Sequence, residues 1–501
     1  MTGFWERNRA AITALVVTAL VIGFFIRDLE PKVWVSILLS GLTLGALFFL
    51  VAAGLSLIFG LMDVLNFAHG IFFMLGAYIG WTVFTNPRLL FNTVPLFLAL
   101  GAGMLAAPVA GPPIWRRQRR PFVQRALPWL LLIAGGTVAA LAFRDYNLDR
   151  LVAFGPTVAG GSIPTAEAQE PISRVLQRMA LMLVAGLILS PILARRHQDD
   201  ERSSRIARRL GLIFGFGIVG LILLYARDAG ETFVLNLNVD LRFLLALIVG
   251  TGAGALVGGL TEWALIRPLY TRPIYQVLLT LGLVFVGTEF VKAVWGPAAY
   301  PPLERPSFFS ASCRSEGLLA WLSEHCASVN VLGRAFPTYR LFIIGVGLLV
   351  FVAVTILLRR SRLGMTIRAG VEDSEMVESL GINVRRMFTL VFALGSGLAA
   401  LGGVVVTPFL GLNPGMGLEF LLQAFIVVVI GGLGSFPGAA MGAVLVGLAR
   451  AFGDYFVISG LQLPGMAEQM RFSPAIARAS TVLIMAIVLL VRPAGIFGTK
   501  E

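Results

Sequence analysis

Long apolar runs recur along the chain, each about as long as a helix that crosses a membrane. Such a helix needs about 20 mostly apolar residues to traverse roughly 30 Å of hydrocarbon. Hydropathy alone does not separate a full span from a re-entrant half-helix. The pattern therefore predicts an all-α polytopic membrane protein with about 12–14 transmembrane or re-entrant helices. The runs lie near residues 10–26, 36–60, 66–85, 94–110, 127–143, 177–194, 210–226, 243–265, 274–296, 339–358, 388–408, 418–434, 437–456 and 475–491.

The composition favours a membrane protein over a soluble one, because 57% of the residues are hydrophobic and only 13% are charged. Both values lie outside the usual range of soluble domains. Arg7 and Arg9 precede the first apolar run, as in a signal peptide, but no small-residue cleavage site follows the run. We therefore expect residues 1–35 to hold an extra helix that is retained as an anchor.

The formal net charge of +13 comes mainly from arginines in three loops between apolar runs. Cytoplasmic loops of membrane proteins carry such an excess of basic residues. The pattern predicts contact with the bilayer, no nucleic-acid partner, and both termini in the cytoplasm. The three clusters are Arg116, Arg117, Arg119, Arg120 and Arg125; Arg195, Arg196, Arg202, Arg205, Arg208 and Arg209; and Arg359, Arg360, Arg362, Arg368, Arg385 and Arg386. The segments expected to face outward are 27–33, 86–93, 144–174, 227–242, 297–338 and 409–417.

Glycines interrupt the apolar stretch VVVIGGLGSFPGAAMGAVLVG at residues 427–447. Gly431, Gly432 and Gly434 stand between its two apolar halves, so we predict a broken helix. Unwound backbone at membrane depth needs protein or a water-filled cavity around it, so these glycines are candidates for a transport pathway. The alternative interpretation is close packing of helices over small residues.

A second interrupted stretch, LIFGLMDVLNFAHGIFFMLGAY, carries Asn66 and His69 between apolar halves. Asn66 could cap exposed backbone amides at the start of a helix, and His69 could bond to a neighbouring helix. The alternative is a pathway or gating role, because polar residues in membrane segments are candidates for function.

Two pairs of polar residues are spaced along single predicted helices. Glu289 and Lys292 are three residues apart, so we expect each to neutralise the other. Glu419 and Gln423 stand one turn apart on the helix that leads to the glycine break. We therefore take Glu419 and Gln423 as pathway candidates.

The long cytoplasmic loop 359–387 contains a short amphipathic helix in its pattern. One face is apolar and much of the remainder is acidic, which suits docking into a groove on a cytoplasmic partner better than resting on anionic lipid. A glycine then ends the helix at the C-cap. The candidate coupling residues are Glu372, Glu375, Met376, Val377, Glu378, Leu380 and Gly381.

No pattern in the chain points to an enzyme. The lysines and serines form neither a phosphate-binding loop nor a nucleophile elbow, and the three histidines form no metal-binding motif. We expect no metal and no directly bound cofactor. The two cysteines, Cys313 and Cys326, both lie in the outward loop 297–338, where an oxidising compartment would let them pair; two free thiols are the alternative.

Five ordered blocks of the sequence resemble the H-type membrane subunit of ATP-binding-cassette importers for branched-chain amino acids. The segment from Glu375 to Gly381 also resembles the Glu-Ala-Ala-x-x-x-Gly coupling loop of such permeases, with Met376 and Val377 in place of the two alanines. The five blocks are NFAHGIFFMLGAY, TLGLVFVGTEFVKAVWG, TIRAGVEDSEMVESLGINVRRMFTLVFALGSGLAALGGV, FIVVVIGGLGSFPGAAMGAVLVG and VRPAGIFG.

The resemblance implies a non-catalytic transport subunit in the bacterial inner membrane. Its expected partners are a second homologous permease, two cytoplasmic subunits that bind ATP and Mg²⁺, and a periplasmic substrate-binding protein. The substrates would be branched-chain or related hydrophobic amino acids, with urea or short amides as an alternative. A rival from another class is an ion-coupled secondary transporter, in which Asp63, Glu289 or Glu419 would bind the ion.

The resemblance also divides the chain. The permease core would comprise residues 36–85, 243–300 and 339–501. Two regions have no counterpart in the resemblance: residues 86–242, with about four extra transmembrane helices, and the outward loop 301–338 with its two cysteines.

Overall fold

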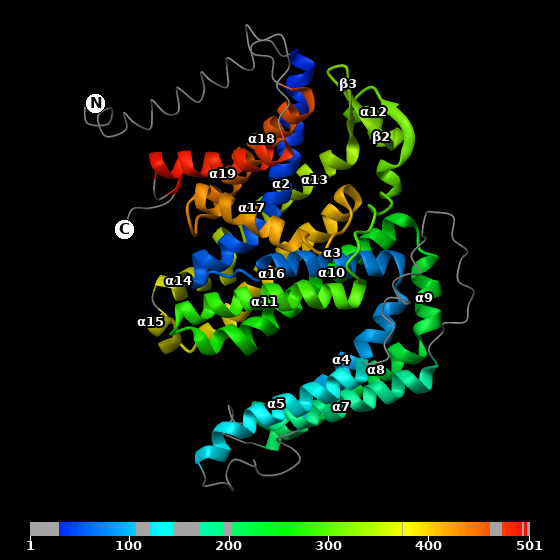
Figure 1. The fold of residues 1–501 in the computed structure, drawn as a ribbon, viewed down its shortest axis with the longest axis vertical. Coiled ribbons are helices and arrows are strands. Elements are labelled where there is room, and N and C mark those ends of the chain that lie inside the picture. Colours follow the sequence, from blue (N-terminus) through cyan, green and yellow to red (C-terminus); the bar gives the residue numbers. More distant parts are fainter. Residues whose placement is uncertain are drawn as a thin grey trace. The chain divides into compact units, whose positions relative to one another are not determined.

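A computed structural model describes residues 30–106, 121–143, 171–194, 203–372, 374–460, 473–492 and 495–497 (Figure 1). Every predicted apolar run within these residues forms a helix, whereas the run 10–26 lies outside them. Among the described residues, eight helices are long and apolar enough to cross a membrane, and one bent pair could add a ninth. Four shorter apolar helices accompany them. The prediction of an all-α polytopic membrane protein is confirmed.

The chain folds into two compact units. Residues 82–238 form one, and the chain before and after them forms the other. The helices of the larger unit are α2 (Pro31–Met62), α3 (His69–Thr85), α10 (Val239–Thr261), the π-helix η2 (Glu262–Ile266), the 3₁₀-helix η3 (Arg267–Leu269), α11 (Pro273–Trp295), α13 (Thr338–Arg360), α14 (Arg362–Glu372), α15 (Ser374–Ser379), α16 (Val384–Leu410), α17 (Met416–Gly431), α18 (Phe436–Ser459) and α19 (Pro474–Val491). The last few residues of α3 already belong to the smaller unit.

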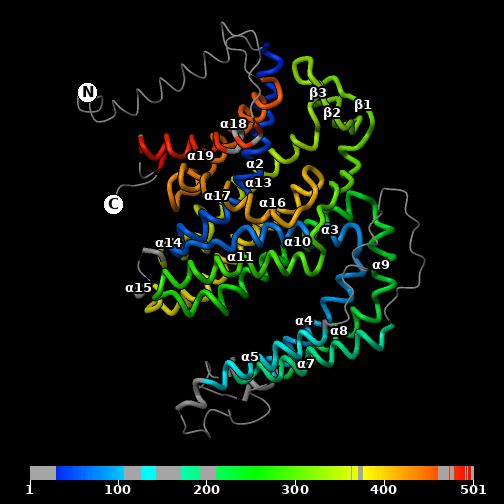
Figure 2. Tube along the Cα trace, viewed as in Figure 1, coloured from blue at the N-terminus to red at the C-terminus, as the bar shows by residue number. Residues whose placement is uncertain are grey.

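Helix α2 lies at the centre of the larger unit. It packs against α13, α16, α17 and α18, and Figure 2 shows α2 and α18 side by side although they are far apart in the sequence. From Leu47 to Ile58 every residue of α2 is buried. A helix that is apolar on all sides is stable only when other helices surround it, so this part of α2 forms the core of the unit.

A small β-sheet stands in the segment between α11 and α13. It consists of β1 (Ala311–Ser315), β2 (Cys326–Val331) and β3 (Arg334–Pro337), accompanied by η4 (Ser307–Phe309) and α12 (Leu318–Glu324). Strand β2 pairs in parallel with β1 and antiparallel with β3. Cys313 and Cys326 are joined by a disulfide that ties β1 to β2. The sequence pattern predicted only an outward loop over residues 297–338, so the sheet is a correction to that prediction.

The smaller unit is a bundle of α4 (Arg88–Ala106), α5 (Pro121–Phe143), α7 (Ile172–Ala194), α8 (Ser203–Tyr225) and α9 (Arg227–Leu235). Helix α4 packs against α7 and α8, and α5 packs against α7. At one end, Arg88 of α4 forms ion pairs with Asp228 at 2.7 Å and Glu231 at 3.2 Å, both on α9. These ion pairs tie α9 to the bundle. The boundaries of this unit lie near the region 86–242 that the sequence analysis set apart.

Candidate functional site

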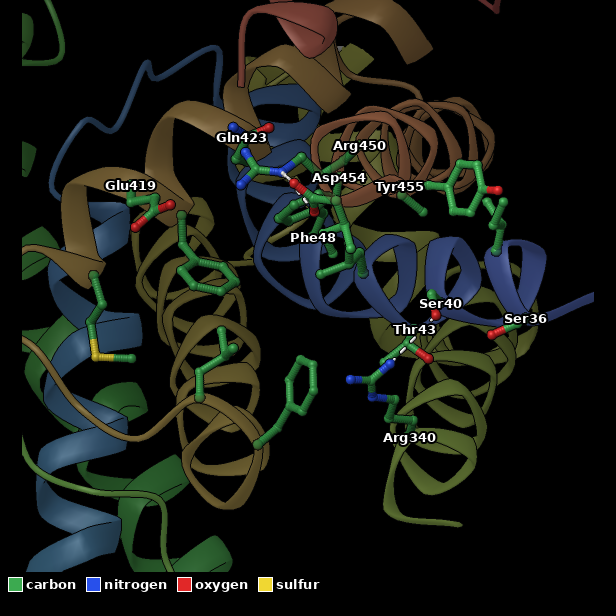
Figure 3. A pocket seen from close by; sticks show the side chains of 18 of the residues that line it. Ser36, Ser40, Thr43, Phe48, Arg340, Glu419, Gln423, Arg450, Asp454 and Tyr455 are labelled. Carbon is green, nitrogen blue, oxygen red and sulfur yellow. Dashed lines mark hydrogen bonds and ion pairs between the residues drawn. The ribbon is translucent and has the colours of Figure 1, made fainter. Parts of the chain in front are cut away.

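A cavity of about 600 Å³ lies within the larger unit, between α2, α13, α17 and α18 (Figure 3). Its walls come from the first half of α2, the start of β3, the start of α13, the end of α16 with the loop that follows it, the start of α17 and the end of α18. Ligand sites in proteins typically measure about 300–1,000 Å³, so the cavity is large enough for a small molecule. Its lining residues are Val33, Ser36, Ile37, Ser40, Thr43, Leu44, Phe48, Arg334, Arg340, Phe409, Leu410, Gly411, Asn413, Met416, Glu419, Phe420, Gln423, Arg450, Ala451, Asp454, Tyr455 and Ile458.

Glu419 and Gln423, two of the predicted pathway candidates, both line this cavity. They stand one turn apart on α17, and Figure 3 shows both on the same part of the wall. The Glu419 carboxylate has no ion-pair or hydrogen-bond partner among the described residues. The amide oxygen Oε1 of Gln423 is buried and likewise accepts no hydrogen bond from the described chain. This wall therefore offers acceptor oxygens without donors.

Arg340 supplies the opposite charge from the first turn of α13. Its Nη1 donates a hydrogen bond to the hydroxyl of Ser40 at 3.4 Å, and its guanidinium carbon lies 5.0 Å from the ring centre of Phe409. No carboxylate within the described part of the chain pairs with it. The sequence pattern did not predict a role for Arg340, because a single arginine at the start of an apolar run is typical of an ordinary helix end.

Arg450 and Asp454 are also cavity residues that the sequence analysis missed. They are four residues apart on α18, and the Arg450 Nε atom lies 3.1 Å from the Asp454 carboxylate. Because they neutralise each other, they add little net charge to the cavity. The remainder of the wall is largely apolar, with the aromatic rings of Phe48, Phe409 and Phe420.

Asn66 and His69 do not line the cavity. Asn66 lies in the turn that joins α2 to α3, and His69 is the first residue of α3. The Oδ1 of Asn66 accepts a hydrogen bond from the amide of Ala68 at 3.1 Å. The Nε2 of His69 bonds to the carbonyl oxygen of Val51 on α2. Both side chains therefore bond to backbone groups of this chain, as in the structural roles that the sequence suggested for Asn66 and His69.

Gly431, Gly432 and Gly434 also lie away from the cavity: Gly431 is the last residue of α17, and the other two lie in the predicted break between α17 and α18. Gly432 and Gly434 adopt positive φ angles of 102° and 80°, which turn the chain back on itself. A Cβ atom on Gly431 would approach the backbone of Gly438 to 2.3 Å. The positions therefore agree with the close-packing interpretation of this stretch.

The predicted coupling segment forms α15 between α14 and α16. Gly381 has a φ of +83°, and its amide donates a hydrogen bond to the carbonyl oxygen of Glu378, which ends the helix as the pattern predicted. Met376 and Leu380 are 61% and 69% exposed. Val377 is a correction: only 4% of it is exposed, so it packs inside this chain and is not part of an exposed face.

The acidic residues around α15 form the rest of this segment. Glu378 is exposed, whereas the side chains of Glu372 and Glu375 lie outside the described part of the structure.

On α11, Lys292 and Glu289 form an ion pair at 2.7 Å, which confirms the expectation that they neutralise each other. Among the described residues, no group of His, Cys, Asp or Glu could hold a metal ion.

Comparison with known proteins gives a consistent result. The sequence model of the family described as branched-chain amino acid transport system / permease component matches residues 37–194 and 205–492. The chain is 27% identical over 310 residues to the high-affinity branched-chain amino acid transport system permease protein LivH of Escherichia coli. The aligned region covers 58% of this chain and 90% of LivH. It is 37% identical over 171 residues to the permease protein BraD of Pseudomonas aeruginosa, covering 34% of this chain and 50% of BraD. The fructose import permease protein FruF of Bifidobacterium longum is 28% identical over 268 residues, or 50% of this chain and 67% of FruF. No solved structure matches the chain.

Proposed function

Because the chain belongs to the family of branched-chain amino acid transport permease components, we propose that it is the membrane subunit of an ATP-driven importer. It would move branched-chain or related hydrophobic amino acids into the cytoplasm across the bacterial inner membrane. Its partners would be a second homologous permease, two cytoplasmic subunits that bind ATP and Mg²⁺, and a periplasmic binding protein. Both termini would lie in the cytoplasm.

The exposed apolar pair of Met376 on α15 and Leu380, the residue that follows α15, carries the proposal. Two large apolar side chains stand four residues apart, beside acidic residues, in a segment that joins two arginine-rich helix ends. An amphipathic helix with such spacing is suited to a groove on another protein. A transporter that works alone would have no need of this surface, whereas a permease without an ATPase of its own must receive the energy from a partner.

The alternatives differ in substrate or in energy source. A relative such as FruF, named for fructose, makes a sugar the first alternative substrate, and urea or short amides are a second. In an ion-coupled transporter, one of Asp63, Glu289 and Glu419 would bind the ion. Of these, Glu289 is already engaged by Lys292, which weakens that alternative.

The test replaces Leu380 with aspartate and follows both the partners and the transport. The matched control is Leu332→Asp, because Leu332 is 65% exposed in the turn between β2 and β3, far from α15 along the chain. We expect Leu380→Asp to abolish co-purification of ATP-binding subunits, identified by mass spectrometry, and to abolish leucine uptake by cells. Leu332→Asp should keep both. The proposal is wrong if the unaltered chain purifies alone and moves leucine into proteoliposomes on an ion gradient.

A further inference from the structure

Three basic residues gather at one end of the cavity, where α2 and α13 both begin. Arg334 and Arg340 line the cavity, and Lys32 is the second residue of α2. A Cβ atom on Gly333, next to Arg334, would lie 3.5 Å from the Lys32 Nζ. None of the three cations forms an ion pair with a carboxylate in the described ranges. Lys32, Arg334 and Arg340, here called the basic cluster, therefore create a positive potential that attracts anions.

The ring of Phe336 places Arg334 and Arg340 on the same side of β3. The guanidinium carbon of Arg340 lies 5.8 Å from the centre of this ring, and Phe336 is buried. Arg334 precedes Phe336 by two residues in the strand, and side chains two residues apart in a strand point to the same face. Both arginines thus lie on the face of β3 that carries Phe336. Arg334 is exposed, so an anion can reach the pair from outside.

Helix α2 adds two hydroxyl groups beside the arginines. Ser36 and Ser40 are one turn apart and line the cavity, and the Ser40 hydroxyl accepts a hydrogen bond from Nη1 of Arg340 at 3.4 Å. Figure 3 shows Ser36, Ser40 and Arg340 on one side of the cavity and Glu419 on the other. The guanidinium fork matches the oxygens of a phosphate group, and a serine hydroxyl can donate to a further oxygen.

Neither carboxylate of the cavity neutralises the basic cluster. Asp454 pairs with Arg450 on its own helix, at 3.1 Å, and Glu419 lies across the cavity from Arg340 (Figure 3). A headgroup that carries an ammonium group next to its phosphate would bring a positive charge towards three others. The basic cluster therefore favours a headgroup whose only charge is the negative charge of the phosphate.

The surroundings of the basic cluster are typical of the boundary between hydrocarbon and lipid headgroups. Helices α2 and α13 are both long and apolar enough to cross a membrane, and both begin here. Trp34 lies in the first turn of α2 and packs against Phe452 of α18, and Tyr455 lines the cavity. Tryptophan and tyrosine are enriched at this boundary, and basic pockets between transmembrane helices can bind anionic lipid headgroups.

The rim of the cavity is apolar and open to the outside. Ile458 and Leu410 line the cavity and are nevertheless 87% and 51% exposed. Val33 continues the apolar surface along α2. An inorganic phosphate ion gains nothing from these three side chains, whereas an acyl chain would remove them from water.

We propose that the basic cluster binds the phosphodiester group of an anionic phospholipid, such as phosphatidylglycerol. Arg340 and Arg334 would hold the phosphate oxygens together with the hydroxyls of Ser36 and Ser40, and Lys32 would add positive charge. An acyl chain would leave the cavity over the apolar rim. The inference goes beyond the proposed function and does not depend on it, because a bound lipid need not be transported.

The test measures how much radiolabelled phosphatidylglycerol the immobilised full chain retains in mild detergent at constant ionic strength. The competitors are unlabelled phosphatidylglycerol, phosphatidylethanolamine with the same acyl chains, and inorganic phosphate. We expect saturable retention of phosphatidylglycerol, with phosphatidylethanolamine competing about tenfold worse. Inorganic phosphate up to about 10 mM should not displace the lipid, because it lacks the apolar contacts.

The variants assign the retention to the basic cluster. Arg340→Gln and Arg334→Gln should each weaken retention of phosphatidylglycerol about fivefold or more, because each removes a charge-assisted contact. Arg340→Lys should keep part of the retention. The matched control is Arg314→Gln, which removes the same charge from β1 of the same sheet, where Arg314 bonds to Asn330 outside the cavity. This control should retain the lipid like the unaltered chain. Because Arg334 is exposed, Arg334→Gln provides the test even if Arg340→Gln does not fold.

Four outcomes would overturn the inference. The first two are equal competition by the two phospholipids and displacement of phosphatidylglycerol by millimolar inorganic phosphate. The third is that both glutamine variants of the cluster retain as much lipid as Arg314→Gln. The fourth is recovery of the chain as a dimer that retains no lipid, because a second copy would then cover the cavity. None of these outcomes concerns leucine uptake, so the proposed function stands or fails separately.

Discussion

The Nε2 atom of His69 lies 3.0 Å from the carbonyl oxygen of Val51, and this hydrogen bond joins the first residue of α3 to the middle of α2. A carbonyl oxygen only accepts, so Nε2 carries the proton and donates. The His69 ring is fully buried and lies edge-on to Phe72. The bond gives this polar residue a structural role between two apolar helices.

Replacing His69 with alanine should destabilise the protein more than it impairs transport. The variant loses one buried hydrogen bond and leaves a cavity where the ring stood, which we expect to cost about 1–4 kcal/mol. The measurement is the thermal midpoint of the purified chain in detergent, together with leucine uptake per folded molecule. A normal midpoint with uptake lost would instead favour the gating interpretation of His69.

The turn between α17 and α18 should tolerate no Cβ atom at Gly431. Alanine there would drive its Cβ into the backbone of Gly438, and we expect a loss of about 1–3 kcal/mol or more. Gly282 on α11 is the matched control, because a Cβ there meets nothing within 4 Å. Gly282→Ala should be neutral or slightly stabilising, by up to about 1 kcal/mol. Equal thermal midpoints for the two variants would contradict the packing interpretation.

The disulfide between Cys313 and Cys326 allows a test of orientation. In intact cells, a maleimide that does not cross membranes should label neither cysteine until a similarly excluded reductant is added. The separation of the two cysteines is 13 residues, and closing a loop of about that length stabilises a fold by about 3 kcal/mol in the chain-entropy account. We therefore expect the Cys313→Ser/Cys326→Ser variant to be cleaved faster by external protease in this segment. Labelling without reduction would contradict the disulfide, and absence of labelling after reduction would contradict the outward orientation.

Tyr270, in the turn between η3 and α11, should hold the buried carboxylate of Glu262 in place. Its hydroxyl donates a hydrogen bond to Glu262, and the Arg267 Nε lies 3.6 Å from the same carboxylate. Tyr270→Phe removes the hydroxyl and should cost about 1–3 kcal/mol. The thermal midpoint measures this loss, and Tyr275→Phe, at a nearby exposed tyrosine, should leave it unchanged.

The stability that the Tyr270 hydroxyl contributes should be lost only at high pH. Burial, and then the hydrogen bond to Glu262, raise the pKa of Tyr270 above its ordinary value. Because the folded protein favours the neutral phenol, the stabilisation is complete below the unfolded pKa of about 10 and is lost as the pH rises through the folded pKa. The difference between wild type and Tyr270→Phe should thus be constant between pH of about 6 and 9. A difference that changes within this interval would contradict the assignment.

Patterns with a helical period could be predicted well from the sequence. Glu419 and Gln423 are four residues apart, so their shared face on α17 follows from the geometry of a single helix. Gly381 ends α15 because its positive φ is easily adopted only by glycine, and that position was also predictable. These are local relationships, in which a few neighbouring residues contain all the information.

Relationships between distant segments could not be predicted in the same way. Arg340 faces the same cavity as Glu419 only because α13 and α17 both pack near α2, and hydropathy gives no account of which helices become neighbours. Val377 was expected on an exposed face, but tertiary packing buries it. The strands β1 to β3 are four to six residues long, and their pairing depends on contacts across a disulfide and a short helix.

The length of α2 links the cavity to the thickness of the membrane. With 32 residues and a rise of 1.5 Å per residue, α2 is about 48 Å long, whereas the hydrocarbon layer measures about 30 Å. The helix must tilt or project from the layer. Its first half, from Val33 to Phe48, lines the cavity, so lipids with longer chains would draw more of that wall into hydrocarbon and lipids with shorter chains would leave more of it in water. We therefore expect the hydration of the part of the cavity wall that α2 forms to vary with the thickness of the surrounding lipid layer.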